Sequence, residues 1–251
     1  DTAIFSVVNS VLLKPLPYPE SERLVLLNER SPQIDSMSIA YPNFIDWRAQ
    51  NTAFEDLAVY RRQDYNLIGS GEPERLVAGM VSASLFDVLR VQAARGRVFI
   101  EEEDRFGSSP VVVLSHGLWQ RRFGGDPGIL HQTISLVGRS YTGIGVMAPD
   151  LQFPSRVEMW VPVGQSSRNP GWENRGNHPG LFGIARLKPG VTIESARDDM
   201  EMVAANLEKQ YPNSNTGNRV ALISALESTV RRIKSLLYIL LGAVGFVLLI
   251  A

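Results

Sequence analysis

The sequence predicts an α+β domain in which strand–helix–strand units at both ends of the chain enclose a strand-rich middle. Near the N-terminus, a helical pattern follows a short apolar strand and precedes a pair of longer strands. Near the C-terminus, a long amphipathic helix lies between two strands. Between residues 91 and 180, short apolar runs separated by Gly and Pro predict strands with little helix. Helices separated from a strand-rich region in this way indicate an α+β fold with an inserted lobe.

The first unit begins with an apolar strand at residues 24–27. A helix is predicted over residues 40–50, with Phe44, Ile45 and Trp47 on its apolar face.

Thr52 and Glu55 have the spacing of a capping box, which predicts a second, short helical turn. Two strands at residues 58–67 and 75–82 follow, joined by a Gly- and Pro-containing turn. A short helix at residues 84–89 completes the unit.

The middle region contains a continuously apolar run at residues 111–114, which predicts a strand buried on both faces. Ser115 is placed to cap the helix that follows. A hairpin is predicted at residues 133–147 and another strand at 157–163. The polar, Gly- and Pro-rich segment 164–180 is a predicted loop.

The last third begins with an alternating strand at residues 181–187. Thr192 then caps a long helix that Pro212 ends. A strand at residues 219–225 follows. The apolar residues of the helix recur at steps of three and four, at Ile193, Ala196, Met200, Val203, Leu207 and Tyr211.

The two termini predict membrane helices that the sequence contains only in part. Residues 236–251 carry no charge and no polar face, although they fall short of the roughly 20 residues that span a bilayer. Residues 3–13 are similarly apolar. A wholly buried core helix is the alternative for the C-terminal run. The predicted membrane-spanning residues are Leu236, Leu237, Ile239, Leu240, Leu241, Val244, Phe246, Val247, Leu248, Leu249 and Ile250.

Composition excludes several classes of function. Net charge is −1, which argues against a nucleic-acid partner because such proteins present a strongly basic face. The absence of cysteine excludes disulfides, thiolate metal sites and a cysteine nucleophile. Arg231, Arg232 and Lys234 precede the C-terminal run, but flanking charge does not decide the side on which a long domain lies.

No catalytic, metal or cofactor-binding constellation is visible. His116, His131 and His178 lie in different predicted elements and lack metal-ligand spacing. Residues 143–148 match the letters of a dinucleotide fingerprint, but prolines follow where a helix is required. No P-loop lysine motif occurs. Ser115 weakly resembles a nucleophile elbow, which leaves a Ser115 hydrolase as a third-ranked hypothesis.

Long stretches of the chain resemble the MacB-like periplasmic core domain of FtsX-type ABC transporter permeases, in the duplicated orphan branch. The resemblance covers nearly the whole chain and is carried by AIFSVVNSVLLKPLPYPESERLV, AYPNFIDWRAQNTAFEDLA, VVVLSHGLWQRRFGGDP, LKPGVTIESARDDMEMVAANLEKQYP and LLGAVGFVLLIA.

The resemblance implies that the domain lies between two membrane helices on the periplasmic side of the bacterial inner membrane. It implies a Porter-like subdomain with an inserted Sabre-like lobe. The expected segments are the end of a first membrane helix (1–19), the Porter-like parts (20–90 and 181–228), the Sabre-like lobe (91–180) and the start of a second membrane helix (229–251).

The resemblance also implies a function: ATP hydrolysis on a separate ABC ATPase subunit drives a mechanical step, such as efflux, outside the membrane. The expected partners are that ATPase, a second permease copy, the lipid membrane and a periplasmic adaptor. Neither catalysis nor a cofactor is expected in this chain, since ATP binds the partner subunit. The alternative is a membrane-anchored extracytoplasmic ligand-binding or sensor domain, motivated by the loop 164–180 and the inserted lobe.

Overall fold

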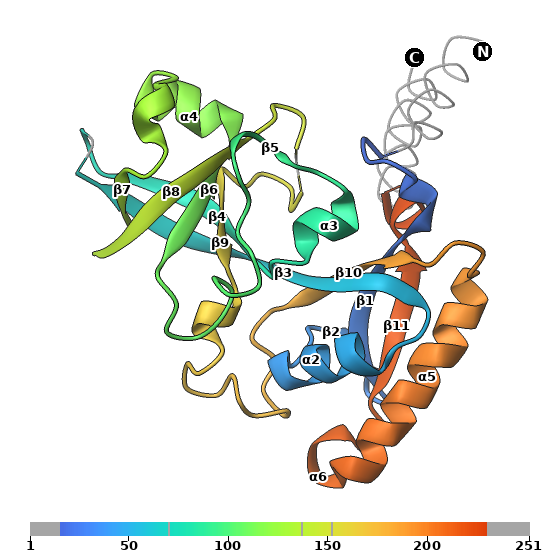
Figure 1. Ribbon diagram of the computed structural model, residues 1–251. Coiled ribbons are helices and arrows are strands. Elements are labelled where there is room, and N and C mark those ends of the chain that lie inside the picture. The colour runs from blue at the N-terminus through green and yellow to red at the C-terminus, as the bar shows by residue number, and fades with distance from the viewer. Residues whose placement is uncertain (1–15, 70, 137, 152, 230–251) are drawn as a thin grey trace, which may run out of the picture.

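The computed structural model describes residues 16–229 except 70, 137 and 152, and these residues form a mixed α/β fold around one eleven-stranded sheet (Figure 1). The strands run in the order β11-β1-β10-β3-β4-β9-β6-β8-β5, with β2 beside β1 and β7 beside β3 and β8. The strands are β1 (Leu24–Ser31), β2 (Ile34–Met37), β3 (Phe54–Ile68), β4 (Glu74–Val81), β5 (Ala93–Gly96), β6 (Val111–Leu114), β7 (Thr133–Leu136), β8 (Arg139–Met147), β9 (Met159–Pro162), β10 (Phe182–Leu187) and β11 (Arg219–Ser224). The helices are α2 (Tyr41–Gln50), α3 (Leu85–Leu89), α4 (His116–Phe123), α5 (Ile193–Gln210) and α6 (Pro212–Asn215), with 3-10 turns at Ser21–Arg23, Pro127–Ile129 and Gly164–Ser166.

The 15-residue strand β3 lies in the middle of the strand order and takes part in both halves of the sheet. Its first half pairs with β10, up to Tyr60 opposite Phe182, and its second half pairs with β4. We call β1, β2, β10 and β11 with α2, α5 and α6 the α5 lobe, and β4 to β9 with α4 the α4 lobe (Figure 1). Because the lobes share a strand, they are parts of one sheet.

The predicted subdomain boundaries are not visible as breaks in this sheet. Strand β4 falls in the predicted segment 20–90 and β9 in 91–180, yet the two are parallel neighbours with Ala78 opposite Met159. The division into Porter-like and Sabre-like parts therefore stays a prediction.

Hydrophobic residues cover both faces of the sheet. In β3, Leu57 and Val59 belong to one buried cluster, which also holds residues of α2, α4 and α5. Ala58 points to the other face, where it joins a second cluster beneath α3. Burial of each large side chain contributes about 1.5–3 kcal/mol, so the alternation along the strands stabilises both layers.

Helix α5 confirms its prediction closely. The Thr192 side chain accepts a hydrogen bond from the Ser195 amide at 3.1 Å, which caps the helix. The predicted inward residues Ala196, Met200, Val203 and Leu207 are buried, and Ile193 and Tyr211 pack partly buried against them. Pro212 ends α5 but also starts α6, which was not predicted.

The start of β3 differs from the prediction. Thr52 and Glu55 form no capping box. Instead, the Thr52 amide and hydroxyl donate to the Asp199 carboxylate of α5 at 2.9 and 2.6 Å, and the chain enters β3 at Phe54. The Asp199 carboxylate, 147 residues away in the sequence, thus accepts from the Thr52 amide in place of the Glu55 side chain that a capping box would use. Ile45 of α2, predicted to face inward, is 46% exposed.

The remaining elements follow the sequence pattern, except that strands β2 and β5 were not predicted. Strands β4, β6, β8, β9 and β10, the hairpin β7–β8 and helices α3 and α4 lie where they were predicted, within a few residues. Strand β5 was missed because its mostly exposed residues are two alanines, an arginine and a glycine, and it pairs irregularly with β8. No hydrophobic alternation marks such an edge strand.

Candidate functional site

Both ends of the described chain leave the domain at one place (Figure 1). Strands β1 and β11 are antiparallel neighbours with Val25 opposite Ser224, so the start of β1 and the end of β11 lie at the same edge. Leu16 and Thr229, the first and last described residues, line the same groove. A force applied at the two ends would therefore enter the domain at a single point.

At the C-terminal end, β11 continues directly into a helix that begins at Ala225. The Ser224 hydroxyl accepts from the Glu227 amide at 3.5 Å, and the Thr229 hydroxyl donates to the Ala225 carbonyl at 3.0 Å. Ala225 itself is buried. Because no loop separates strand from helix, rotation between them is restricted.

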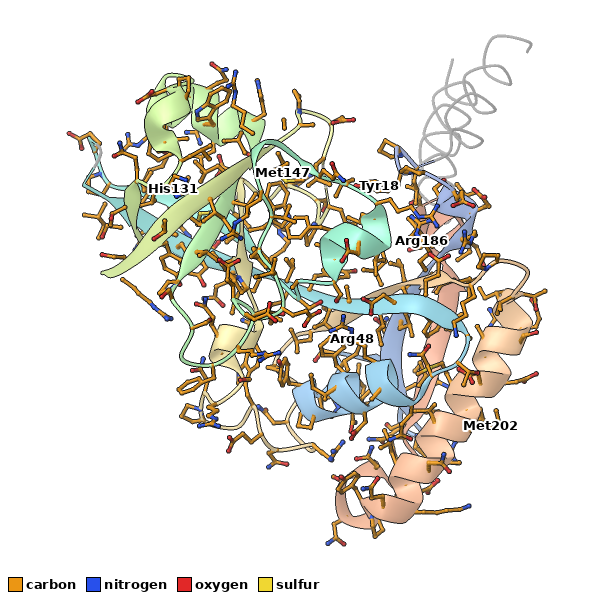
Figure 2. The ribbon with its side chains drawn as sticks, viewed as in Figure 1. Tyr18, Arg48, His131, Met147, Arg186 and Met202 are labelled. Carbon is orange, nitrogen blue, oxygen red and sulfur yellow. The ribbon has the colours of Figure 1, made fainter. Side chains whose placement is uncertain are left out.

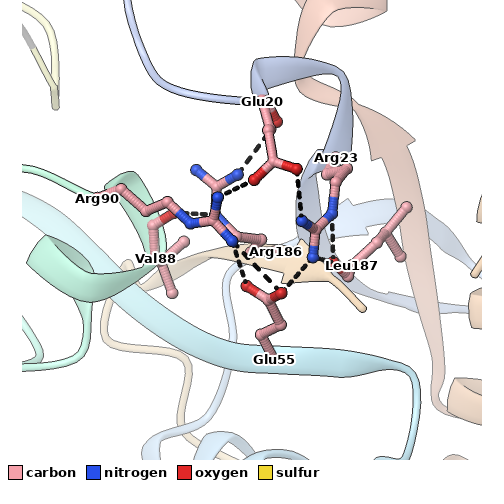
Figure 3. A network of polar contacts seen from close by, with 7 residues as sticks. All are labelled: Glu20, Arg23, Glu55, Val88, Arg90, Arg186 and Leu187. Carbon is pink, nitrogen blue, oxygen red and sulfur yellow. Dashed lines mark hydrogen bonds and ion pairs between the residues drawn. The ribbon is translucent and has the colours of Figure 1, made fainter. Parts of the chain in front are cut away.

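At the N-terminal end, a network of charged side chains holds residues 16–23 against the sheet (Figure 3). Arg23 of the 3-10 turn bridges Glu20 at 3.0 Å and also contacts Glu55 of β3. Arg90, which follows α3, contacts the same two carboxylates. Glu20 adopts a left-handed backbone conformation with φ 47°, which is uncommon for a residue other than glycine.

Arg186 of β10 is the buried centre of this network. It is 1% exposed, and its guanidinium donates to the Val88 carbonyl at 2.8 Å and to the Glu20 carbonyl at 3.1 Å. Its second terminal nitrogen has no hydrogen-bond partner among the described residues. Burial and the charges of Arg90 and Arg23 lower the pKa of Arg186. The side chain therefore ties α3, β10 and the N-terminal segment together.

A second group of contacts joins the two lobes. Arg48 of α2 binds Asp56 of β3 at 2.7 Å and Glu101, in the loop after β5, also at 2.7 Å. In the α4 lobe, Asp104 of the same loop accepts from the amides of Ala83 at 2.9 Å and Gly164 at 2.5 Å.

Burial raises the pKa of Asp104 to about 7, partly offset by its two amide hydrogen bonds. This carboxyl is thus neutral far above the pH at which an ordinary aspartate ionises.

Side-chain hydrogen bonds hold part of the loop 164–180 against the α5 lobe. The buried carboxylate of Glu29 binds the His178 ring at 2.9 Å and the Asn43 side chain at 2.9 Å. The hydrogen bond to Glu29 raises the pKa of His178. Arg175 donates to Asn43 at 2.8 Å, and Trp172 is buried. These contacts hold Trp172, Arg175 and His178 against the α5 lobe, while residues 168–171, 173, 174 and 176 are exposed.

Not all of the predicted site residues belong to the part of the chain that the structure describes. The membrane-spanning residues from Leu236 to Ile250 lie outside the described residues, as do the first fifteen residues. Within the described ranges, no helix is long and apolar enough to cross a membrane. The membrane helices therefore stay predictions.

Ser115 acts as the cap of α4, since its hydroxyl accepts from the Leu118 amide at 3.1 Å. The ring of His116 packs against Trp119 rather than against the serine. Figure 2 shows His131 in the α4 lobe, far from Arg186 and Tyr18. In the part of the chain that the structure describes, no group of three His, Asp or Glu residues is placed to hold a metal ion.

Sequence reasoning missed the Arg186 network. Its members are spread from Glu20 to Arg186 without a recurring spacing, and only the strand pairing brings them together. One signal existed: Arg186 interrupts the apolar strand predicted at residues 181–187.

Comparison with known proteins identifies the family. The model of the MacB-like periplasmic core domain matches residues 2–203. No curated protein matches the sequence.

Three solved structures share the fold. The periplasmic region of MacB from Actinobacillus actinomycetemcomitans aligns at 11% identity and a TM-score of 0.61, covering 85% of this chain and 94% of that one. A domain of a putative permease from Porphyromonas gingivalis aligns at 14% identity and 0.64, covering 82% and 92%. The extracellular domain of the noncanonic ABC-type transporter YknZ from Gram-positive bacteria aligns at 13% identity and 0.56, covering 79% and 99%. This chain therefore belongs to the MacB-like periplasmic core domain family of ABC transporter permeases.

Proposed function

We propose that this chain is the extracytoplasmic domain of an ABC transporter permease, in the duplicated orphan branch, and that it converts ATP hydrolysis on a separate subunit into motion outside the inner membrane. The observation that carries the proposal is that both ends leave side by side, one of them through a strand that continues as a helix. Family membership supports a transporter context.

A displacement of the two ends has a rigid path into the domain. The C-terminal helix moves β11, and β11 pairs with β1 along six residues. The Arg186 network ties the N-terminal segment to β10 and α3. Strand β3 then reaches from the α5 lobe to the α4 lobe. Packed sheets transmit such displacements because their interiors are dense and weakly compressible.

The proposal includes the expected partners. The permease works with an ABC ATPase subunit on the cytoplasmic side and as a pair of permease copies in the lipid membrane. The α4 lobe, at the far end of the shared sheet, is the part available to a periplasmic adaptor. ATP binds only the partner subunit, and this chain performs no catalysis.

Two measurements on the full-length permease test this proposal. Purification from nanodiscs followed by mass spectrometry should recover an ABC ATPase whose hydrolysis the permease stimulates. Reporter fusions beyond each end of the chain should place the domain outside the cytoplasm. A cytoplasmic location, or a permease that repeatedly purifies without an ATPase, would count against the proposal.

A membrane-anchored ligand-binding or sensor domain remains the second candidate. The loop 164–180 gives this candidate little support because hydrogen bonds to Glu29 and Asn43 hold part of the loop against the α5 lobe. A groove of about 500 Å³ beside the chain ends supports it instead. This reading predicts saturable ligand binding without any ATPase partner.

A further inference from the structure

The groove lies on the side of the sheet where the two chain ends leave. Its floor consists of aliphatic side chains from β1 and β10, namely Leu24, Leu26 and Ile184. Its volume of about 500 Å³ is within the range of about 300–1,000 Å³ typical of small-molecule sites. The second hydrophobic cluster of the sheet is thus left partly open here.

One wall of the groove is aromatic and held in place. The rings of Tyr60 and Phe153 meet edge to face, with centroids 4.6 Å apart. The indole of buried Trp160 donates to the Phe153 carbonyl at 2.9 Å, which fixes the segment after β8. The wall therefore exists before any ligand arrives.

Among the described residues that line this apolar space, Arg62 is the cation. Arg62 follows Tyr60 by two residues in β3, so the two side chains lie on the same face of the sheet. Arg62 is exposed, lines the groove and forms no ion pair with any of the described residues. Among the described residues, the groove combines an apolar floor, an aromatic wall and the guanidinium of Arg62, which has no ion-pair partner there. This combination is complementary to a ligand with a long apolar part and a single anionic group.

We propose that this groove binds a single-chain anionic amphiphile, with its acyl chain against Leu26, Ile184 and Phe153 and its anionic group at Arg62. The ligand chemistry rests on the groove alone. That the ligand comes from the adjoining bilayer rests on the proposed function.

Photo-crosslinking of the 251-residue chain in a nonionic detergent tests the proposal. The probe is palmitate carrying a diazirine on its chain, and the matched probe is the uncharged alcohol with the same chain. We expect palmitate to label peptides containing Phe153 and Ile184, unlabelled palmitate to compete, and the alcohol to label about tenfold less, since a charge-assisted hydrogen bond is lost.

Three variants separate the contributions. Arg62→Gln should reduce palmitate labelling about tenfold, to the level of the alcohol. Arg30→Gln, an exposed arginine of β1 away from the groove, should leave labelling unchanged. Ser155→Trp, at an exposed position of the rim, should block both probes.

Two results would overturn the proposal: equal labelling by both probes, or labelling scattered outside the groove. The readout requires no ATPase. The groove proposal can therefore be wrong while the transporter proposal holds, or right while the transporter proposal is wrong.

Discussion

Replacing Arg186 by methionine tests whether its buried guanidinium ties the N-terminal segment to the sheet. The side chain is 1% exposed and makes hydrogen bonds of 2.8 and 3.1 Å to two backbone carbonyls. Each such bond to a charged donor contributes about 1.5–3 kcal/mol. Removing a desolvated cation that Arg23 and Arg90 repel offsets part of this loss. Methionine keeps the packing of the aliphatic stem.

The net expectation is a loss of about 2–4 kcal/mol in the free energy of unfolding. At about 2–4 °C per kcal/mol for a domain of this size, the apparent Tm falls by about 4–16 °C. Trp47, Trp119, Trp160 and Trp172 are all buried, so their fluorescence reports the transition in the detergent-solubilised chain.

Arg90→Met is the matched control. Its side chain is 38% exposed, and its ion pairs with Glu20 and Glu55 contribute about 0–1 kcal/mol each. A Tm shift for Arg186→Met that is no larger than the shift for Arg90→Met would refute the assignment of Arg186 as the centre of the network.

Three further predictions concern single residues. Since the folded-state pKa of Asp104 is raised from 3.8 to about 7, its contribution to stability is full below about pH 4 and is lost as pH rises to 7. The Tm of the native chain relative to that of Asp104→Asn should therefore fall between about pH 4 and about pH 7. A Tm difference that does not change with pH would contradict the assignment of the raised pKa to burial. Because the Glu29 contact raises the pKa of His178, the advantage of the native chain over His178→Gln should be complete below about pH 6.5 and should disappear as pH rises through the higher folded-state value, which thermal melts between pH 5 and 9 would detect. Ser115→Ala should cost about 1 kcal/mol of stability through the lost helix cap; loss of a hydrolytic activity without a change in Tm would instead favour the hydrolase hypothesis.

Most helices and strands were predicted correctly because the residues that mark them are neighbours in the sequence. Helix α5 has a cap, a regular apolar face and a proline stop, and strand β6 is continuously apolar. The start of β3 was mispredicted because Asp199, far away in sequence, supplies the acceptors that a local capping box would supply.

The candidate site was less accessible to sequence reasoning. Glu20, Arg23, Glu55 and Arg90 are ordinary surface charges in the sequence, and only the folded sheet gathers them around Arg186. The groove likewise combines residues from β1, β3, β10 and the segment after β8. Both features depend on strand order, which local periodicity does not encode.

In the proposed mechanism, motion at the chain ends reaches the α4 lobe through the junction of β11 and the helix that begins at Ala225. The 251 residues contain no cysteine, so Thr133→Cys, at an exposed position of the α4 lobe, is the one spin-label site within this domain. Distances between the labels of two permease copies would be measured in nanodiscs with the ATPase, with and without ATP. The same distances would be measured after insertion of Gly-Gly-Ser between Ser224 and Ala225. They would also be measured after a control insertion between Gly71 and Glu72 in the hairpin turn. We expect a nucleotide-dependent distance change that the first insertion abolishes and the control insertion preserves. An unchanged distance, or a change that survives the first insertion, would contradict the proposed mechanism.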